Sequence, residues 1–398
     1  QPAASKGENL LNALPSKLGP HTEKIKIMED NSWLNIGQAA SDEKWGVEGV
    51  ARGRAWCSKM AYAKNLGGAF FCGTGVHGYV KSNGHYMDDL WFYDANAHKW
   101  ICLYPGADKN TKLHLDSNGL EIDEDGNHIP VSYLSHAYNN VTYNSDLRKY
   151  HIMWTQCPWW GKAVPQRWDW LGIPEEKRTY GNSGAVIPTP KHPLFWDVTA
   201  GKWDRKFVTG SGPNGRFEGI AEYIPSLQKT LYLHQGVFWT YDYSENTWAT
   251  GPKAPALTKG GYDSNGCYDP KTDRIYVAGG KSFAYFDIKT NTWVQLEAKN
   301  QPENLLSTNS SQLFFDTAND VVLWHQTNGP IFIYNPTTND WVDLGNTTPE
   351  ITGHKSMCVN GFYNVELNAY FFYMAGDSNL KNATMLVYRY KNPTKELK

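Results

Sequence analysis

The sequence predicts an all-β fold built from one repeated unit of four strands. Three observations support this prediction: a turn followed by a Trp recurs along the chain, a strand-turn-strand pattern precedes it, and later copies are evenly spaced. Aromatic residues make up 14% of the chain, and aromatic side chains fit the pleated surface of a sheet.

The second half of each unit is an aromatic strand, a turn built on Asp or Asn, and a Trp that opens the next strand. Asp and Asn suit such turns because their side chains bond the backbone and tolerate positive φ. The copies read FYDANAHKW, FWDVTAGKW, TYDYSENTW, YFDIKTNTW and IYNPTTNDW, and they end at Trp100, Trp203, Trp248, Trp293 and Trp341.

The first half of each unit is a strand, a polar turn and a second strand. It reads MAYAKNLGGAFFCGTG, VTYNSDLRKYHIMWTQ, AEYIPSLQKTLYLHQG, GCYDPKTDRIYVAGG, LFFDTANDVVLWHQTNG and GFYNVELNAYFFYMAGD. Later copies are 45 to 48 residues apart, measured from Tyr223, Tyr268, Phe315 and Tyr363. That spacing is typical of a β-propeller blade. We therefore predict one propeller domain over residues 1–398, with six recognisable blades and a seventh if a degenerate one lies in the spacers.

The blade pattern resembles kelch repeats of the galactose-oxidase type. The YD-x-x-T-x-x-W turn runs through five units, and YVAGG at 276–280 contains the double glycine of those repeats. The resemblance covers about residues 53–390 and implies four-stranded kelch-like blades. The last unit ends with TMLVYRY and lacks its Trp strand, whereas KIKIMEDNSWLNIG near the N-terminus offers one with Trp33. We predict that these strands pair and close the ring, which would remove exposed sheet edges.

Two insertions interrupt the spacing, and both are predicted to lie on one face of the propeller. The first, about 105–134, contains LEIDEDGNHIP, a predicted protruding hairpin with Asp-Gly at its tip. Its acidic residues could hold a structural calcium ion, although they lack the order of a helix–loop–helix site. The second, about 156–193, is rich in Trp. It is interpreted as one wall of a binding cleft, with a cap over a blade edge as the alternative.

Composition indicates a secreted glycoprotein that acts as a monomer. The net charge of -2 favours neither nucleic acid nor an anionic membrane as a partner, and no run of 18 apolar residues is present. The chain begins at Gln1 without a signal region, as a processed chain would. Six cysteines permit disulfides, although free buried thiols fit the same strand patterns. Glycosylation sequons occur at Asn140, Asn309, Asn346 and Asn382.

Residues that can move protons or bind anions collect in the segments expected on one propeller face. This collection of Arg and His in a nearly neutral chain suggests an anionic ligand. The loop between the second and third predicted strands of the first unit contributes His77, Tyr79, Lys81 and His85. The starts of inner strands contribute Arg54, His136, Arg216 and His354, and the ends of second strands contribute His234 and His325.

A uronate-containing glycan is the anionic ligand that an aromatic-rich secreted propeller would meet. Its cleavage by β-elimination needs a cation on the carboxylate, a base and an acid, and no cofactor. Arg54 or Arg216 could neutralise the carboxylate, His85, His136 or His234 could be the base, and Tyr79 or Tyr180 the acid. Predicted substrate contacts are His77, Lys81, Trp159, Trp160, Arg167, Trp168, His325 and His354. This composition is similar to that of propeller-fold polysaccharide lyases.

Three alternatives remain open from the sequence. A hydrolase would need two carboxylates across a cleft; Asp88, Asp89 and Glu218 are available but suggest no clear pair. A kelch-type copper oxidase would need two His, two Tyr and a Cys joined to one Tyr, and no motif matches that set. A glycan-binding propeller without catalysis would use the Trp-rich insertion alone.

Overall fold

The computed structural model describes residues 10–41, 51, 53–54, 57–72, 88–107, 111–117, 120–129, 137–153, 168–169, 171–178, 191–213, 219–255, 264–279, 282–303, 311–326, 329–349, 359–374 and 383–392. These residues form six four-stranded antiparallel sheets and one two-stranded sheet. The prediction of an all-β propeller with six blades is confirmed, and a seventh blade is not present in the described ranges.

The first three blades follow one another along the chain. Blade 1 is β2 (Ala61–Ala63), β3 (Gly68–Phe71), β4 (Leu90–Asp94) and β5 (Lys99–Tyr104). Blade 2 is β8 (Val141–Asn144), β9 (Lys149–Ile152), β10 (Leu194–Asp197) and β11 (Lys202–Arg205). Blade 3 is β12 (Ile220–Ile224), β13 (Lys229–His234), β14 (Val237–Asp242) and β15 (Thr247–Lys253).

The remaining blades have the same up-and-down order, except that blade 6 borrows a strand. Blade 4 is β16 (Asn265–Asp269), β17 (Arg274–Gly279), β18 (Ser282–Asp287) and β19 (Thr292–Leu296). Blade 5 is β20 (Ser311–Asp316), β21 (Val321–Gln326), β22 (Pro330–Asn335) and β23 (Asp340–Thr347). Blade 6 is β24 (Val359–Asn364), β25 (Ala369–Met374), β26 (Thr384–Arg389) and the N-terminal strand β1 (Ser32–Gly37).

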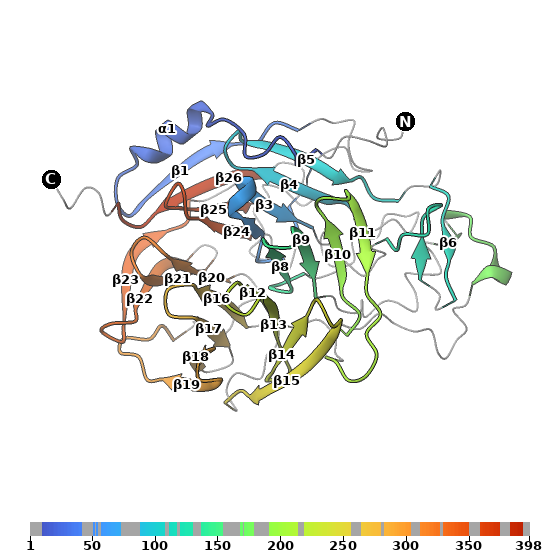
Figure 1. Ribbon diagram of the computed structural model, residues 1–398. Helices are drawn as coiled ribbons and strands as arrows, with labels where there is room; N and C mark the ends of the chain where they lie inside the picture. Colours follow the sequence, from blue (N-terminus) through green and yellow to red (C-terminus); the bar gives the residue numbers. More distant parts are fainter. Residues whose placement is uncertain are drawn as a thin grey trace.

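The first strand of each blade lies nearest the centre of the molecule (Figure 1). Each of these inner strands contacts the inner strand of the next blade, from β2 through β8, β12, β16 and β20 to β24, and β24 contacts β2. Met60 and Gly361 join blades 1 and 6 through a backbone hydrogen bond of 2.8 Å. The inner strands therefore surround one axis, and any axial site has walls from several blades.

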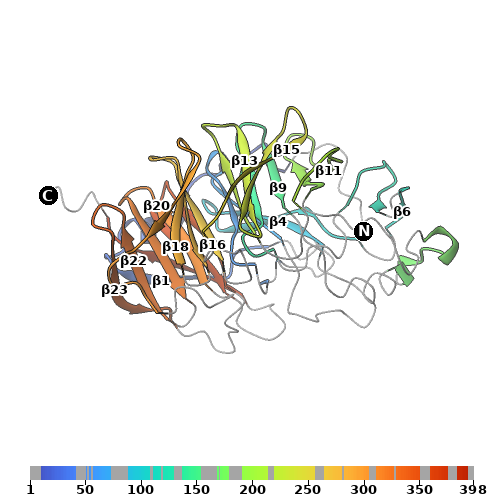
Figure 2. The ribbon, with the colours of Figure 1, turned by 90° about the horizontal axis from the view of Figure 1, so that it is seen from below.

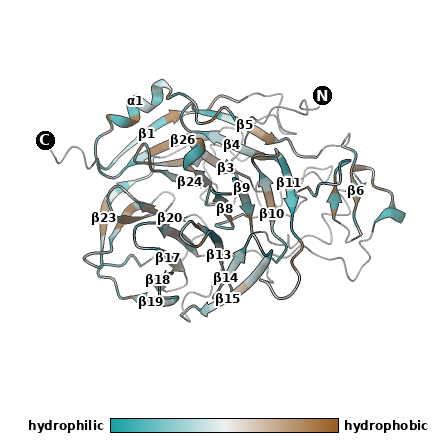
Figure 3. Ribbon diagram, viewed as in Figure 1, coloured by the Kyte–Doolittle hydropathy of each residue, from teal (hydrophilic) through white to brown (hydrophobic). Residues whose placement is uncertain are grey.

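The N-terminal segment supplies the outer strand of blade 6. Strand β1 pairs antiparallel with β26, and Trp33 stands opposite Tyr388. The start of the predicted segment differs from expectation, because α1 (Pro20–Lys26) is a short helix that Pro20 opens. The helix is mostly hydrophilic (Figure 3) and buries Thr22 and Ile25. Within the described ranges, no helix has the length and apolar character needed to span a membrane.

The repeated Trp is a cross-strand partner of an aromatic residue on the third strand. Ring centroids lie 5.1 Å apart for Tyr93 and Trp100, and 5.3 Å apart for Tyr334 and Trp341. The registers that place these pairs opposite each other are Tyr93↔Trp100, Trp196↔Trp203, Tyr241↔Trp248, Phe286↔Trp293 and Tyr334↔Trp341. Such aromatic pairs stabilise a sheet beyond the area that they bury.

The Asp or Asn of each predicted turn caps that turn. Asp242 accepts backbone N–H bonds from Ser244 (2.9 Å) and Glu245 (3.1 Å), and Asn335 accepts one from Thr337 (2.8 Å). The residue four positions after the cap has a positive φ, as in His98, Arg148, Asn246, Asp273, Asn291, Asp320, Asn339 and Asn368. The predicted use of Asp and Asn in these turns is confirmed.

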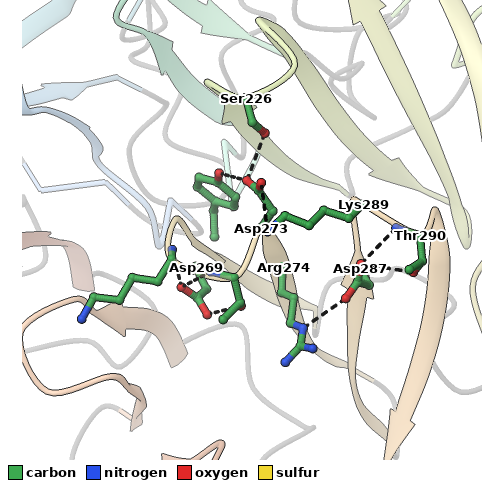
Figure 4. A network of polar contacts seen from close by, with 10 residues as sticks. Ser226, Asp269, Asp273, Arg274, Asp287, Lys289 and Thr290 are labelled. Atoms are coloured by element: carbon green, nitrogen blue, oxygen red, sulfur yellow. Dashed lines mark hydrogen bonds and ion pairs between the residues drawn. The ribbon is translucent and has the colours of Figure 1, made fainter.

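Polar contacts also link the turns of neighbouring blades (Figure 4). Ser226, in the first turn of blade 3, donates a 3.0 Å hydrogen bond to Asp273 in the first turn of blade 4. Within blade 4, Arg274 donates to Asp287 at 3.2 Å and lies over the ring of Tyr285, 4.4 Å from its centroid. These contacts fix the turns against one another on one side of the propeller.

The first insertion contains the predicted hairpin. Strand β6 (His114–Leu115) pairs with β7 (Glu121–Ile122), and the following turn places Gly126 at φ 78°. Asp123 caps this turn by accepting the N–H of Asn127 at 2.8 Å. The hairpin lies apart from the blades, at the end of the molecule opposite β23 (Figure 2).

Candidate functional site

The antiparallel blades divide the axial ends of the propeller into two faces. Inner strands begin, and second strands end, at the face that we call the loop face: Ile220 pairs with Leu233, near the end of β13. The short capped turns after the inner strands lie at the opposite face, which we call the turn face. The sequence predicts the site at the loop face. Of its members, His234 and His325 lie at the loop-face ends of second strands, and Arg54 precedes the inner strand β2.

Most other predicted site residues lie outside the described residues, so their roles stay predictions. Those residues are His77, Tyr79, Lys81, His85, His136, Trp159, Trp160, Arg167, Tyr180, Arg216 and His354. The strands on either side of these segments are among the described residues. For example, the segment with His85 joins the end of β3 to the start of β4, and the segment with Arg216 leads into β12.

Arg54 is buried in an ion pair at the loop face. Its Nη2 donates to Oδ1 of Asp89 at 2.8 Å, and neither side chain is more than 4% exposed. The second oxygen of Asp89 accepts the indole N–H of Trp91 at 2.6 Å, and the guanidinium lies over the ring of Phe71. The backbone N–H of Arg54 also donates to Asn360 of blade 6 at 3.2 Å. The positive charge of Arg54 is therefore balanced within the protein.

His325 is held between blades 5 and 6. Its Nδ1 lies 2.7 Å from Oε1 of Gln312, and its Nε2 lies 2.6 Å from the Thr348 hydroxyl. The imidazole is fully buried and packs against Phe372, with centroids 4.4 Å apart. Both ring nitrogens thus have protein partners, which suits a residue that positions the two blades.

His234 ends the second strand of blade 3, as predicted, but its side chain is only 2% exposed. Its ring stacks on Tyr232 with centroids 5.6 Å apart and planes 7° apart. A role as base would require a substrate to reach this buried ring.

Trp168 joins the two insertions. Its indole N–H donates to Oε1 of Glu121 at 3.0 Å, and the two residues are 2% and 1% exposed. Trp168 also belongs to the core cluster that includes Leu120, Ile129 and Leu171. The burial of Trp168 fits the alternative prediction, a cap over a blade edge, rather than the wall of a binding cleft, because no face of its ring is open to a sugar.

The acidic residues of the hairpin have partners within the protein. Asp116 accepts from Leu120 N–H at 2.8 Å and pairs with His128 at 3.0 Å, while Asp123 caps its own turn. In the described part of the chain, no group of three or more His, Cys, Asp or Glu residues is arranged to hold a metal. The predicted calcium site remains a prediction.

Buried cysteines and a tyrosine lie under the loop face. The sulfur of Cys72 is 2.8 Å from the hydroxyl oxygen of Tyr150, a hydrogen bond between two buried groups. Burial raises the pKa of the Cys72 thiol to about 12. Cys57, Cys72, Cys102 and Cys267 are free and buried, whereas Cys157 and Cys358 lie outside the described residues. Free thiols are therefore observed at four positions.

A chain of small polar side chains crosses the axis near the loop face. Asn139 of blade 2 donates to Ser58 of blade 1 at 3.0 Å and to Asn265 of blade 4 at 2.6 Å. Asn265 in turn donates to Ser311 of blade 5 at 2.7 Å. We call this set the axial amide chain. Its bond between Asn139 and Asn265 joins blades 2 and 4, which are not neighbours.

Beyond the axial amide chain, towards the turn face, lies a cavity of about 340 Å³. Its walls come from all six inner strands, among them Tyr62, Thr142, Glu222, Tyr268, Phe314 and Phe362. Lys59 of blade 1 crosses to blade 3, where its ammonium lies 2.8 Å from Glu222 and 2.7 Å from the Ala221 carbonyl oxygen. Burial raises the pKa of Glu222, and the positive charge of Lys59 opposes that rise. We call this space the axial cavity.

The sequence reasoning missed Lys59 and Glu222. The signal for Glu222 lies in the repeat itself, since the residue before the inner-strand aromatic is otherwise uncharged: Ala61, Thr142, Cys267, Phe314 or Phe362. When the six repeats are aligned, a charge at a position that is uncharged in the other five marks a place where one blade differs from the others. The partner of that charge comes from two blades away.

Comparison with protein-family models finds none that matches this chain.

Proposed function

We propose that the protein is a carbohydrate-active lyase that cleaves a uronate-containing glycan by β-elimination at the loop face. The observation that carries the proposal is topological. The described strands that flank the segments with His85, His136, Tyr180, Arg216 and His354 end or begin at the loop face. Long connections on a rigid propeller are where catalytic groups are usually found.

The ion pairing and burial of the described residues limit which side chains can serve as the cation and the base in this proposal. Arg216 takes the role of neutralising the uronate carboxylate, because the charge of Arg54 is already balanced by Asp89. Bidentate hydrogen bonds from Arg suit a carboxylate and stabilise the charge that develops as the neighbouring proton leaves. His85 or His136 takes the role of base, since His234 and His325 are buried. Tyr79 or Tyr180 would donate the proton to the leaving sugar oxygen.

The test is to incubate the pure protein with a panel of uronate-containing glycans. Elimination creates a conjugated double bond, so ultraviolet absorbance should rise with time. His85→Ala and Arg216→Ala should each lower the rate by roughly 10²-fold or more, the range for loss of an acid–base or charge-stabilising group.

Matched controls come from exposed residues outside the proposed site. His114→Ala on the hairpin and Lys202→Ala at the start of β11 should leave the rate unchanged. Glycan binding without any rise in absorbance across the panel would contradict the proposal and favour a binding module.

A further inference from the structure

The axial cavity has both open volume and charge. Its volume of about 340 Å³ falls in the range of pockets that hold small ligands. The axial amide chain lies between this cavity and the loop face, because Asn139 and Asn265 stand at the loop-face ends of β8 and β16. A ligand would therefore enter from the turn face, independently of the proposed lyase site.

The ion pair of Lys59 and Glu222, which we call the floor of the axial cavity, has hydrogen-bonding capacity that the described residues do not use. The side chains of Lys59 and Glu222 are 16% and 13% exposed, so both reach the cavity. Two of the three ammonium protons of Lys59 go to Ala221 and Glu222. Among the described residues, the third proton and the second carboxylate oxygen of Glu222 have no partner. A ligand would meet one strong donor beside one strong acceptor.

The charge of this floor selects against ions. An anion would be attracted by Lys59 and repelled by Glu222 a few ångströms away, and a cation would meet the reverse. A hydroxyl group both donates and accepts, so adjacent hydroxyls match a donor beside an acceptor. Hydrogen bonds to charged groups are stronger than those between neutral groups.

The walls of the cavity are aromatic rings held in fixed orientations. Tyr62 stacks on Phe362 with centroids 5.7 Å apart and planes 13° apart. The Tyr62 hydroxyl donates to Asn364 at 3.2 Å, and the Tyr268 hydroxyl donates to Asp273 at 2.6 Å. Because these hydroxyls are already bonded, the rings offer the cavity mainly their apolar surface.

We propose that the axial cavity binds one neutral monosaccharide, whose hydroxyls bond Lys59 and Glu222 and whose apolar ring face packs on Tyr62. A hexose combines adjacent hydroxyls with an apolar face of C–H groups, and the floor and walls present the matching surfaces. The site is separate from the proposed lyase site, and it neither requires nor implies turnover.

The experiment is saturation-transfer NMR and calorimetric titration of the full chain with a panel of neutral hexoses and 6-deoxyhexoses, with glucuronic acid as the anionic probe. At least one neutral sugar should bind, and glucuronic acid should bind more weakly in Arg216→Ala, where the proposed lyase site lacks its Arg. Tyr62→Leu and Glu222→Gln should each weaken binding roughly tenfold, as expected for loss of a packing surface or a charged acceptor. Absence of binding by every neutral sugar at millimolar concentration would overturn the proposal, as would a preference for glucuronic acid that persists in Arg216→Ala.

A second variant protects the test against misfolding. Replacing Lys59 with Met and Glu222 with Leu together removes the whole ion pair, and such apolar replacements are often neutral for stability. The double variant should fold, as judged by its melting temperature, and should lose sugar binding. His85→Ala should bind the sugar as well as the unaltered protein does. If it does not, the sugar is bound at the loop face and the axial site is wrong.

Discussion

In several capped turns a single residue meets two requirements at once. Asn339 adopts φ 53° and its side-chain oxygen accepts the hydroxyl of Tyr334, five residues earlier, at 2.9 Å. In blade 1 His98 occupies this position, with φ 52° and its Nδ1 2.7 Å from the Tyr93 hydroxyl. Imidazole thus replaces an amide, and it adds a group that titrates.

The titration of His98 should make stability depend on pH. Burial, with the nearby charge of His21, lowers the pKa of His98 to about 4. The unfolded chain binds a proton near pH 6.5, so the contribution of His98 is present above that pH and is lost as pH falls towards 4. His98→Asn keeps the turn and the acceptor for Tyr93. It should reduce the loss of unfolding free energy between pH 7.5 and 4.5 by about 1–2 kcal/mol, measured by urea denaturation.

The exposed His114 provides the control for this measurement. His114→Asn should leave the pH dependence unchanged, because this side chain is exposed. An unchanged pH dependence in His98→Asn would show that this imidazole is not shielded from solvent.

At the scale of elements, each strand-turn-strand hairpin depends on the backbone conformation at its last turn position. Asp287 caps the hairpin of β18 and β19 by accepting the N–H of Thr290 at 3.1 Å, and Asn291 follows with φ 55°. Asn and Gly tolerate this left-handed conformation, whereas a β-branched residue does not.

Substitution of Asn291 tests that dependence directly. Asn291→Gly should change the free energy of unfolding by less than about 0.5 kcal/mol, since Gly adopts positive φ without strain. Asn291→Val should lower it by roughly 1–2 kcal/mol, the cost of a left-handed conformation for an L-residue with a Cβ. Equal stabilities of the two variants, measured by thermal denaturation, would contradict this explanation.

At the scale of the whole molecule, the two ends of the chain meet in blade 6. Trp33 packs on Tyr388 with centroids 5.0 Å apart and on Phe372 at 5.4 Å. It holds the place that Trp341 holds in blade 5, opposite the aromatic residue of the third strand. Asn31 adds a bond of 2.6 Å from the Tyr388 hydroxyl. One blade is therefore complete only when residues more than three hundred positions apart are joined.

Removal of residues 1–41 should destabilise the protein and expose the edge of β26. We expect a lower melting temperature and concentration-dependent association in light scattering, because an unpaired strand edge can pair with another chain. Adding residues 10–41 as a separate peptide should restore the melting temperature. The same peptide with Trp33→Ala should restore it less, and equal rescue by both peptides would contradict the anchoring role of Trp33.

Much of the fold could be predicted from the sequence because its determinants are local. The capped turn uses residues within five positions of one another, and the Trp stands opposite a residue seven positions earlier, as in Tyr93 and Trp100. Short-range contacts repeat whenever the local sequence repeats. The helix at Pro20–Lys26 was missed because its short length leaves little periodicity, and tertiary contacts of Thr22 and Ile25 hold it in place.

The sequon at Asn140 shows how a local motif can mislead. The motif is complete, yet Asn140 is 1% exposed at the start of an inner strand, where a glycan has no room. Asn346 uses its amide nitrogen to donate to Asn31 at 2.7 Å. The burial of Asn140 and the hydrogen bond of Asn346 depend on packing between blades, and neither has a signal in three consecutive residues.

The sequence by itself determined the repeat, the turn chemistry and the aromatic pairs, because each depends on neighbours along the chain. Only the tertiary structure decided which side chains meet across the axis. Lys59 and Glu222 are 163 positions apart and pair because blades 1 and 3 face one cavity. Arg54 and Asp89 pair because the segment that precedes an inner strand lies beside the start of a third strand. The alternation of side chains along a strand specifies which face of the sheet a residue occupies. Its partner across the axis is specified only by the arrangement of the blades around that axis.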